Sequence, residues 1–284
     1  MQIEFTKMQA TGNDFIVIDE IERAIVANKA EFAKLACDRH FGIGADGVLF
    51  VSKATAGVYG MKIINPDGSE AEMCGNGMRC VALYLKKYHA PTANRFRVKT
   101  LAGIMEPVVA GKMVDVNMGK PSFKCRDLPF ECKSETFLNQ EFKPKSDDKP
   151  MNMTTVSMGN PHAVFFVKNV DKVPLVRLGQ VIGLDYRFQQ GVNVHFAQVV
   201  SKNMVRLVTW ERGAGLTLAC GTGAISTVSA GYKLGLLGTD VRAELPGGEL
   251  NIKLEIDKKG VIANTYLIGP AVEVFRGTFE CPKF

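Results

Sequence analysis

Short apolar runs separated by glycine-rich turns dominate the hydrophobic pattern of this 284-residue chain. Apolar or alternating runs of this length are typical of β-strands. In the first half we expect strands at Ile3–Phe5, Phe15–Ile18, Gly47–Val51, Met61–Ile64, Phe96–Thr100 and Met113–Met118. In the second half we expect them at Thr154–Ser157, Ala163–Val167, Asn193–Gln198, Met204–Val208, Glu249–Ile256 and Val261–Ile268, followed by a last strand at Val272–Arg276.

Helical runs are fewer, and the pattern predicts them at Lys29–Asp38, Arg79–Tyr88 and Ala224–Leu236. The last two are largely apolar on all sides, so we expect each to be enclosed by a sheet. Strands with an occasional helix in each half favour an α+β fold.

The chain repeats itself with a period of about 146 residues. Cys74 and Cys220 lie 220 − 74 = 146 positions apart, and each precedes a Gly-x-Gly turn. Further landmarks keep this register within about two residues: Asn13 with Asn160, Gly47 with Asn193, Asn65 with Glu211, and Gly103 with Gly248. So long a period indicates a duplicated domain rather than a solenoid. We expect a first half at 1–119, completed by 271–284, and a second half at 120–270.

The composition is that of a soluble globular protein, with 46% hydrophobic and 23% charged residues. The net charge of +6 is dispersed, which predicts solvated surface lysines and no nucleic-acid partner. No apolar run reaches the length of a membrane span, and the N-terminus lacks a secretory pattern. We therefore expect a cytoplasmic protein without a membrane partner.

The seven cysteines are an odd number and include no Cys-x-x-Cys pair. The spacings of Cys74 with Cys80 and of Cys125 with Cys132 do not suit a zinc site. The cysteine pattern thus predicts no metal site and no structural disulfide. Cys37, in a helical stretch, is expected to be a small buried residue.

Cys74 and Cys220 each stand where a helix should begin, and a helix N-terminus stabilises a thiolate. The glycines that follow let backbone N–H groups approach a carboxylate closely. Either cysteine alone would be interpreted as a buried structural residue. Covalent catalysis would need only one nucleophile, and redox exchange would favour Cys-x-x-Cys, whereas acid/base catalysis uses two matched thiols.

Two further polar residues have little structural reason to be where they are. His162 lies in a Gly-Asn-Pro-His turn, and Glu211 follows a strand in a glycine-rich turn. In the repeat they correspond to Phe15 and Asn65, so the acid/base groups are not symmetric. The simpler alternatives are a surface imidazole for His162 and a capping role for Glu211. Arg212 suits a substrate carboxylate. Asparagines occupy the repeated turns, where Asn is common in its own right, at positions 13, 65, 76, 160 and 193.

Around these residues the chain closely resembles the diaminopimelate epimerase family. The resemblance runs in the family's order across essentially the whole chain. The matching segments are Lys7-Met8, Gly12-Asn13-Asp14-Phe15, Gly42–Gly47, Asn65–Cys80, Gly159–His162, Glu211–Gly215 and Ala219–Gly223.

The resemblance implies a cofactor-independent epimerase that interconverts LL- and meso-diaminopimelate, in lysine and peptidoglycan-precursor biosynthesis. Its partner would be a small-molecule amino acid, with neither pyridoxal phosphate nor metal. It implies two domains related by pseudo-twofold symmetry, each a mixed or antiparallel sheet wrapped around a central helix. The active site would lie in the cleft between the domains, and the family is typically a cytoplasmic homodimer.

The resemblance also implies roles for individual residues. Cys74 and Cys220 would be the catalytic acid/base pair, with His162 assisting Cys74 and Glu211 assisting Cys220. Backbone N–H groups of four residues would hold the α-carboxylate, namely Gly75, Asn76, Gly221 and Thr222. The remaining contacts to substrate would come from Asn13, Asn65, Asn160, Asn193, Glu211 and Arg212.

Three positions depart from the family pattern. Gly47 stands where some members carry a substrate-contacting Gln, and Leu216 stands where the family usually has Glu. Phe275 replaces a tyrosine that some members use at their dimer interface. Two alternatives follow: a racemase of another amino acid, such as histidine or proline, on the same fold, or a non-catalytic amino-acid-binding protein.

Overall fold

The computed structural model describes residues 2–145 and 149–281, and the chain divides into two compact units. Unit 1 comprises Met1–Asn117 together with Ile268–Phe284, and unit 2 is the continuous segment Met118–Leu267. Strands β9 (Met113–Gly119) and β18 (Ile262–Pro270) carry the chain across the two boundaries. Residues 282–284 of the predicted return segment lie outside the described residues.

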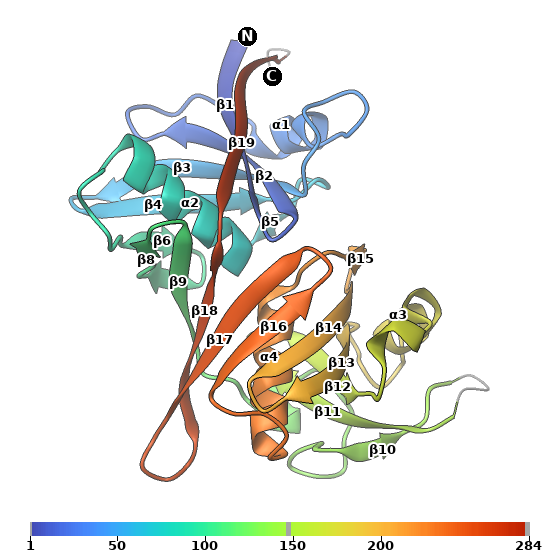
Figure 1. The fold of residues 1–284 in the computed structure, drawn as a ribbon. Helices are drawn as coiled ribbons and strands as arrows, with labels where there is room; N and C mark the ends of the chain where they lie inside the picture. The colour runs from blue at the N-terminus through green and yellow to red at the C-terminus, as the bar shows by residue number, and fades with distance from the viewer. Residues whose placement is uncertain (1, 146–148, 282–284) are drawn as a thin grey trace. The chain divides into compact units, whose positions relative to one another are not determined.

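Unit 1 is built on a mixed sheet in the strand order β19-β1-β2-β3-β4-β6-β7, with the short β5 beside β4. The blue β1 and the red β19 run side by side in Figure 1, in antiparallel register. The predicted last strand therefore belongs to the first unit. The strands are β1 (Gln2–Ala10), β2 (Asn13–Glu20), β3 (Gly47–Thr55), β4 (Val58–Ile64), β5 (Glu70–Ala71), β6 (Val98–Thr100), β7 (Gly103–Met105), and β19 (Val272–Glu280), with β8 (Val108–Ala110) paired to β9.

Unit 2 is built on a second mixed sheet, in the order β10-β11-β12-β13-β14-β16-β17-β18, with β15 beside β14. Its parallel pairs are β12 with β13 and β14 with β16. The strands are β10 (Gln140–Phe142), β11 (Met151–Ser157), β12 (Pro161–Phe166), β13 (Asn193–Ser201), β14 (Met204–Glu211), β15 (Gly215–Thr217), β16 (Asp240–Leu245) and β17 (Gly248–Ile256). Two short 3-10 turns, Cys125–Asp127 and Val170–Lys172, precede β10 and α3.

One long helix packs on each sheet. In unit 1, α2 (Gly75–Tyr88) contacts β1 through β4, and in unit 2, α4 (Gly221–Lys233) contacts β11 through β14 and β17. Most of their side chains are buried, as their largely apolar sequences predict. Each buried aliphatic or aromatic side chain stabilises the fold by ~1.5–3 kcal/mol. The shorter helices are α1 (Lys29–Ala36) and α3 (Leu175–Gly183).

Strand registers confirm the duplicated domain. Both halves pair the strand after the Gly-Asn turn in parallel with the next strand, and they carry a bulge at the same repeated position. The matched pairs are Phe15↔Gly47 with His162↔Asn193, and Val48↔Ile64 with Val194↔Trp210, while the bulges fall at Lys53/Thr55 and Val199/Ser201. The two halves therefore have one backbone plan with different side chains at equivalent positions.

The expectation of no structural disulfide is wrong, because Cys125 and Cys132 are bridged. A 3-10 turn at Cys125–Asp127 folds the chain back, so that the two Cα atoms lie 6.2 Å apart, within bridging range. Neither the spacing nor the composition indicates this fold-back. Cys37 is buried at the C-cap of α1, as predicted.

The part of the chain that the structure describes has no helix with the length and apolar character needed to cross a bilayer. It also brings together no group of three or more His, Cys, Asp or Glu side chains in an arrangement suited to a metal ion.

Candidate active site

Cys74 lies at the N-cap of α2, where an extended backbone (φ −140°, ψ 118°) leads into the first helical turn. Its Sγ accepts a hydrogen bond from the Gly77 N–H at 3.5 Å, and its carbonyl accepts from Met78 at 2.8 Å. The N–H groups of Gly75 and Asn76 precede that first helical bond, as in any α-helix. One turn therefore combines a thiol with helix-start N–H groups at the positive end of the helix dipole.

Cys220 occupies the equivalent N-cap of α4, with nearly the same backbone (φ −120°, ψ 110°). Its carbonyl accepts from the Ala224 N–H at 2.9 Å, and its Sγ lies 3.6 Å from the Thr222 hydroxyl. Cys220 is 3% exposed, whereas Cys74 is only partly buried. The two thiols thus have the same backbone setting and differ in their access to solvent.

Asn13 connects the first thiol to a carboxylate. Its Oδ1 lies 3.8 Å from Cys74 Sγ and accepts from Asn76 Nδ2 at 3.1 Å, while its Nδ2 donates to Asp46 Oδ2 at 2.7 Å. Because a carboxylate only accepts hydrogen bonds, Asp46 fixes the amide with its oxygen toward the sulfur. That oxygen can accept a hydrogen bond from a thiol but has no hydrogen to donate to a thiolate.

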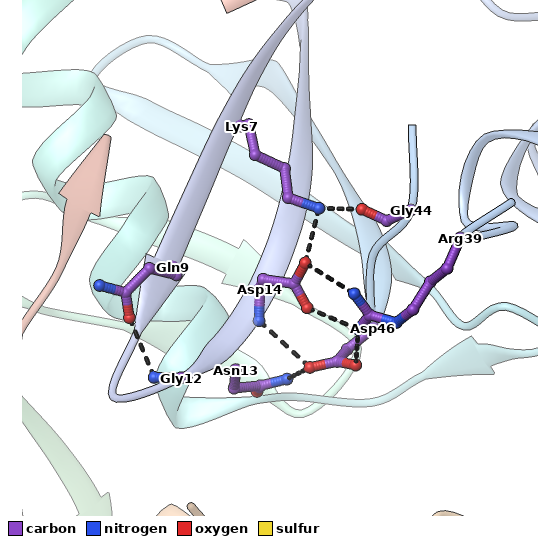
Figure 2. A network of polar contacts seen from close by, with 8 residues as sticks. All are labelled: Lys7, Gln9, Gly12, Asn13, Asp14, Arg39, Gly44 and Asp46. Carbon is purple, nitrogen blue, oxygen red and sulfur yellow. Dashed lines mark hydrogen bonds and ion pairs between the residues drawn. The ribbon is translucent and has the colours of Figure 1, made fainter. Parts of the chain in front are cut away.

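Asp46 belongs to a network of charged side chains, which Figure 2 shows. Arg39 lies between two carboxylates, 2.8 Å from Asp14 Oδ1 and 2.7 Å from Asp46 Oδ1. The largely buried Lys7 lies 2.6 Å from Asp14 Oδ2 and donates to the carbonyl of Gly44. Burial of Asp14 would raise its pKa, but hydrogen bonds from Arg39 and Lys7 outweigh that effect and lower it. This ion-pair network is anchored on β1, β2 and the loop before β3.

Arg79 lies fully buried behind the same helix start. Its guanidinium donates to Asn76 Oδ1 at 2.5 Å, to Thr11 Oγ1 at 3.2 Å and to the Pro270 carbonyl at 3.1 Å. Thr11 has a φ of 55°, which is costly for a β-branched residue, and this turn positions Asn13. Burial lowers the pKa of Arg79 to about 10, so it remains positive at neutral pH.

The second thiol has an acidic neighbour instead. Burial raises the pKa of Cys220 well above its ordinary value, and the Glu211 carboxylate raises it further. The Thr222 hydroxyl and the Gly223 N–H act in the opposite direction. Thr217 Oγ1 donates to Glu211 Oε1 at 2.6 Å and so anchors the carboxylate. Cys220 therefore holds its proton in this state of the protein.

Asn193 and Arg212 are brought together at the ends of β13 and β14. Asn193 Nδ2 donates to the Pro161 carbonyl at 3.1 Å, and its Oδ1 accepts from the Arg212 N–H at 2.9 Å. The Arg212 guanidinium donates to the Gln190 carbonyl at 3.0 Å. Asn193 thus fixes the backbone that carries Glu211 and Arg212.

His162 is fully buried on β12, so a surface imidazole is excluded. Its Nε2 lies 2.8 Å from Asn160 Oδ1, and its Nδ1 lies 2.8 Å from His195 Nε2. His195 Nδ1 lies 3.0 Å from Thr209 Oγ1. Burial lowers the pKa of His162 well below its usual range and that of His195 to about 3, so both rings are neutral.

Asn65 lies in the turn after β4, where its Nδ2 donates to Ser69 Oγ at 3.0 Å.

The three positions that depart from the family pattern lie in different places. Gly47 begins β3, and a Cβ there would lie 3.1 Å from the Ile64 carbonyl. Leu216 is 59% exposed on β15, and Phe275 packs edge-to-face on Phe5.

The sequence pattern predicts no functional role for four residues of this site, namely His195, Asp46, Arg39 and Arg79. His195 follows Asn193 by two positions on one strand, which places both on the same face. The available signal is an imidazole between two apolar residues of this strand, Val194 and Phe196.

Comparisons with known proteins identify what this chain is similar to. The family profile described as Diaminopimelate epimerase matches residues 5–124 and 154–274. A curated protein of that name from Carboxydothermus hydrogenoformans is 43% identical, with 98% of this chain and 99% of that protein covered. One from Halothermothrix orenii is 41% identical, with 98% of each covered, and one from Methanocaldococcus jannaschii is 42% identical, with 96% and 97% covered.

Solved structures share the fold at low sequence identity. A phenazine biosynthesis protein of the PhzF family from Bacillus anthracis superposes with a TM-score of 0.73 at 15% identity, covering 98% of this chain and 99% of that one. A hydroxyproline epimerase from Agrobacterium vitis gives 0.67 at 14% identity, covering 98% and 92%. Both likenesses show the two sheet-rich halves, as predicted.

Proposed function

Because the chain belongs to the diaminopimelate epimerase family, we propose that it interconverts LL- and meso-diaminopimelate by proton transfer at one α-carbon. We further propose that it uses no pyridoxal phosphate and acts as a cytoplasmic homodimer. The observation that carries the chemical proposal is the pair of N-cap cysteines, Cys74 and Cys220, at equivalent positions of a duplicated fold.

The reaction needs a base on one face of the α-carbon and an acid on the other. A thiolate at one cysteine takes the α-proton and becomes a thiol, while the opposite thiol gives its proton to the carbanion and becomes a thiolate. Atoms and charge balance, and the two sulfurs exchange protonation states in each turnover. The two thiols have different neighbours, Asn13 at Cys74 and Glu211 at Cys220.

The α-carbanion needs stabilisation because the α-proton is weakly acidic. In our proposal the helix-start N–H groups of α2 and α4 bind the α-carboxylate and the charge that develops on it. These donors are fixed by the helices before substrate arrives, so they need no reorganisation during the reaction. They belong to Gly75, Asn76, Gly221 and Thr222.

We assign the remaining roles in line with the family. His162 assists Cys74, and Glu211, anchored by Thr217, assists Cys220. Arg212 pairs with the distal carboxylate of the substrate. The other substrate contacts are Asn13, Asn65, Asn160 and Asn193.

Incubation with LL-diaminopimelate in D₂O tests the proposal. The α-proton signal should disappear from the NMR spectrum as the meso isomer forms, and Cys74→Ala and Cys220→Ala should each abolish epimerisation. Proline and histidine in parallel incubations are the controls for substrate class. Exchange with either of these but not with diaminopimelate would overturn the substrate, and full activity in the double variant would overturn the mechanism.

A further inference from the structure

Three buried side chains and the half-buried Asn160 form a line of polar contacts across unit 2. The line runs from Thr209 Oγ1 to His195 Nδ1 at 3.0 Å, from His195 Nε2 to His162 Nδ1 at 2.8 Å, and from His162 Nε2 to Asn160 Oδ1 at 2.8 Å. Thr209, His195 and His162 are each no more than 2% exposed. Buried polar atoms in contact must pair one donor with one acceptor, so the contacts constrain one another.

The direction of the line follows from its end at Asn160. A carboxamide oxygen only accepts, so His162 Nε2 carries the proton that faces it. A neutral His162 then has a bare Nδ1, which accepts from a protonated His195 Nε2. A neutral His195 in turn has a bare Nδ1, which accepts from the Thr209 hydroxyl. Every contact is satisfied when all four groups are uncharged.

We propose that His195 is a positioning residue that fixes His162 as the neutral Nε2–H tautomer and thereby turns the Asn160 amide so that its Nδ2 protons face outward. Asn160 then offers two donors and no acceptor, which suits a carboxylate oxygen of the substrate and not its ammonium group. The substrate half of the proposal rests on the proposed function, and the tautomer half does not.

The surroundings of His195 hold its ring in the position from which both contacts are made. The ring lies against the first turn of α4, where a Cβ on Gly223 would come 2.2 Å from His195 Cε1. The two imidazoles lie 5.0 Å apart between centroids at 34°. Burial lowers the pKa of both rings, which agrees with their neutral state. The same helix carries the Cys220 N-cap, so α4 both positions the second thiol and packs against the His195 ring.

Long-range ¹H–¹⁵N correlation of histidine-labelled protein at neutral pH measures the tautomers directly, without substrate. We expect bare Nδ1 and protonated Nε2 in both buried rings. A protonated Nδ1 on His162 would overturn the proposal, because the line would then run in the opposite direction. This readout stands even if the protein proves inactive on diaminopimelate, so the two proposals can fail separately.

Variants separate positioning from simple packing. His195→Gln keeps a donor toward His162 and an acceptor toward Thr209, so the His162 tautomer should persist and KM should stay near the wild-type value. His195→Phe removes the donor, and KM should rise roughly tenfold with a smaller change in kcat. Thr209→Val removes the hydroxyl with almost no change in volume, and Thr209→Ser keeps the hydroxyl, so this pair repeats the comparison at the far end. Equal KM values for folded His195→Gln and His195→Phe would refute a positioning role.

Discussion

The two buried imidazoles should make unit 2 lose stability in mild acid. The pKa of His195 in the folded protein is about 3, and that of His162 is also well below the ordinary 6.5. Below pH 6.5 the unfolded chain binds protons that the folded chain does not. The stabilising contribution is therefore complete above pH 6.5 and is lost progressively as the pH falls from 6.5 toward 3.

The size of the stability loss follows from how far the pH lies below 6.5. Each imidazole that stays neutral in the folded protein lowers the free energy of unfolding by about 1.36 kcal/mol for each pH unit below 6.5. His195 alone therefore lowers it by ~2 kcal/mol at pH 5. If both rings stay neutral the loss is ~4 kcal/mol, which is a large part of the 5–15 kcal/mol that stabilises a typical domain. Most carboxyl groups titrate at lower pH and contribute little in this interval.

Urea unfolding at pH 7 and pH 5, followed by tryptophan fluorescence, measures the loss. Trp210 is the single tryptophan of the chain and lies on β14, so the signal reports on unit 2. The control is His195→Gln, which replaces one titrating ring with a neutral side chain of similar size. It should halve the dependence of the unfolding free energy on pH. An identical pH dependence in the variant and the wild type would refute the reasoning.

Three further outcomes follow from the site. Gly223→Ala should destabilise the protein by ~1–3 kcal/mol, because its methyl group would meet the His195 ring; a thermal melt that matches wild type would count against this packing. Glu211→Gln should lower the pKa of Cys220 and speed its alkylation by iodoacetamide at pH 8, since the carboxylate raises that pKa; an unchanged rate would contradict the pairing. Asp46→Asn should weaken the charge-assisted bond that orients the amide beside the first thiol and reduce kcat roughly fivefold, about 1 kcal/mol; steady-state kinetics with unchanged kcat would exclude that role.

Local patterns predicted most strands and both long helices, because alternation and apolar runs are local properties. The apolar runs begin one turn later than the helices, at Arg79 and Ala224 instead of Gly75 and Gly221, whereas the cysteines mark the helix starts correctly. Glycines suggest a turn, but the first helical N–H groups need no intrahelical partner, so a helix can begin with them.

Helix α3 was missed for a reason that lies in tertiary packing. Gly179 and Gly183 lower its helix propensity. A Cβ at Gly179 would come 2.4 Å from Trp210 Cγ, so the glycines make room for the indole of β14. Long-range packing of this kind overrides local preference.

The same distinction separates the parts of the site. A cysteine before Gly-x-Gly and an apolar run is a local signal, so both N-cap cysteines could be predicted. The roles of His195 and Asp46 depend on partners 33 residues away in each case, His162 and Asn13. Neither pairing has a signature within its own segment.

Unit 2 is one continuous segment placed between two segments of unit 1, and this has a consequence for biosynthesis. The sheet of unit 1 is completed only when β19 pairs with β1, as in Gln2↔Glu280, and β19 leaves the ribosome after the whole of unit 2. Domains tend to fold as they emerge, so unit 2, with Cys220, can fold cotranslationally, while β1 waits with an unpaired edge. The Cys74 half therefore matures last, and aggregation of nascent chains should begin at β1.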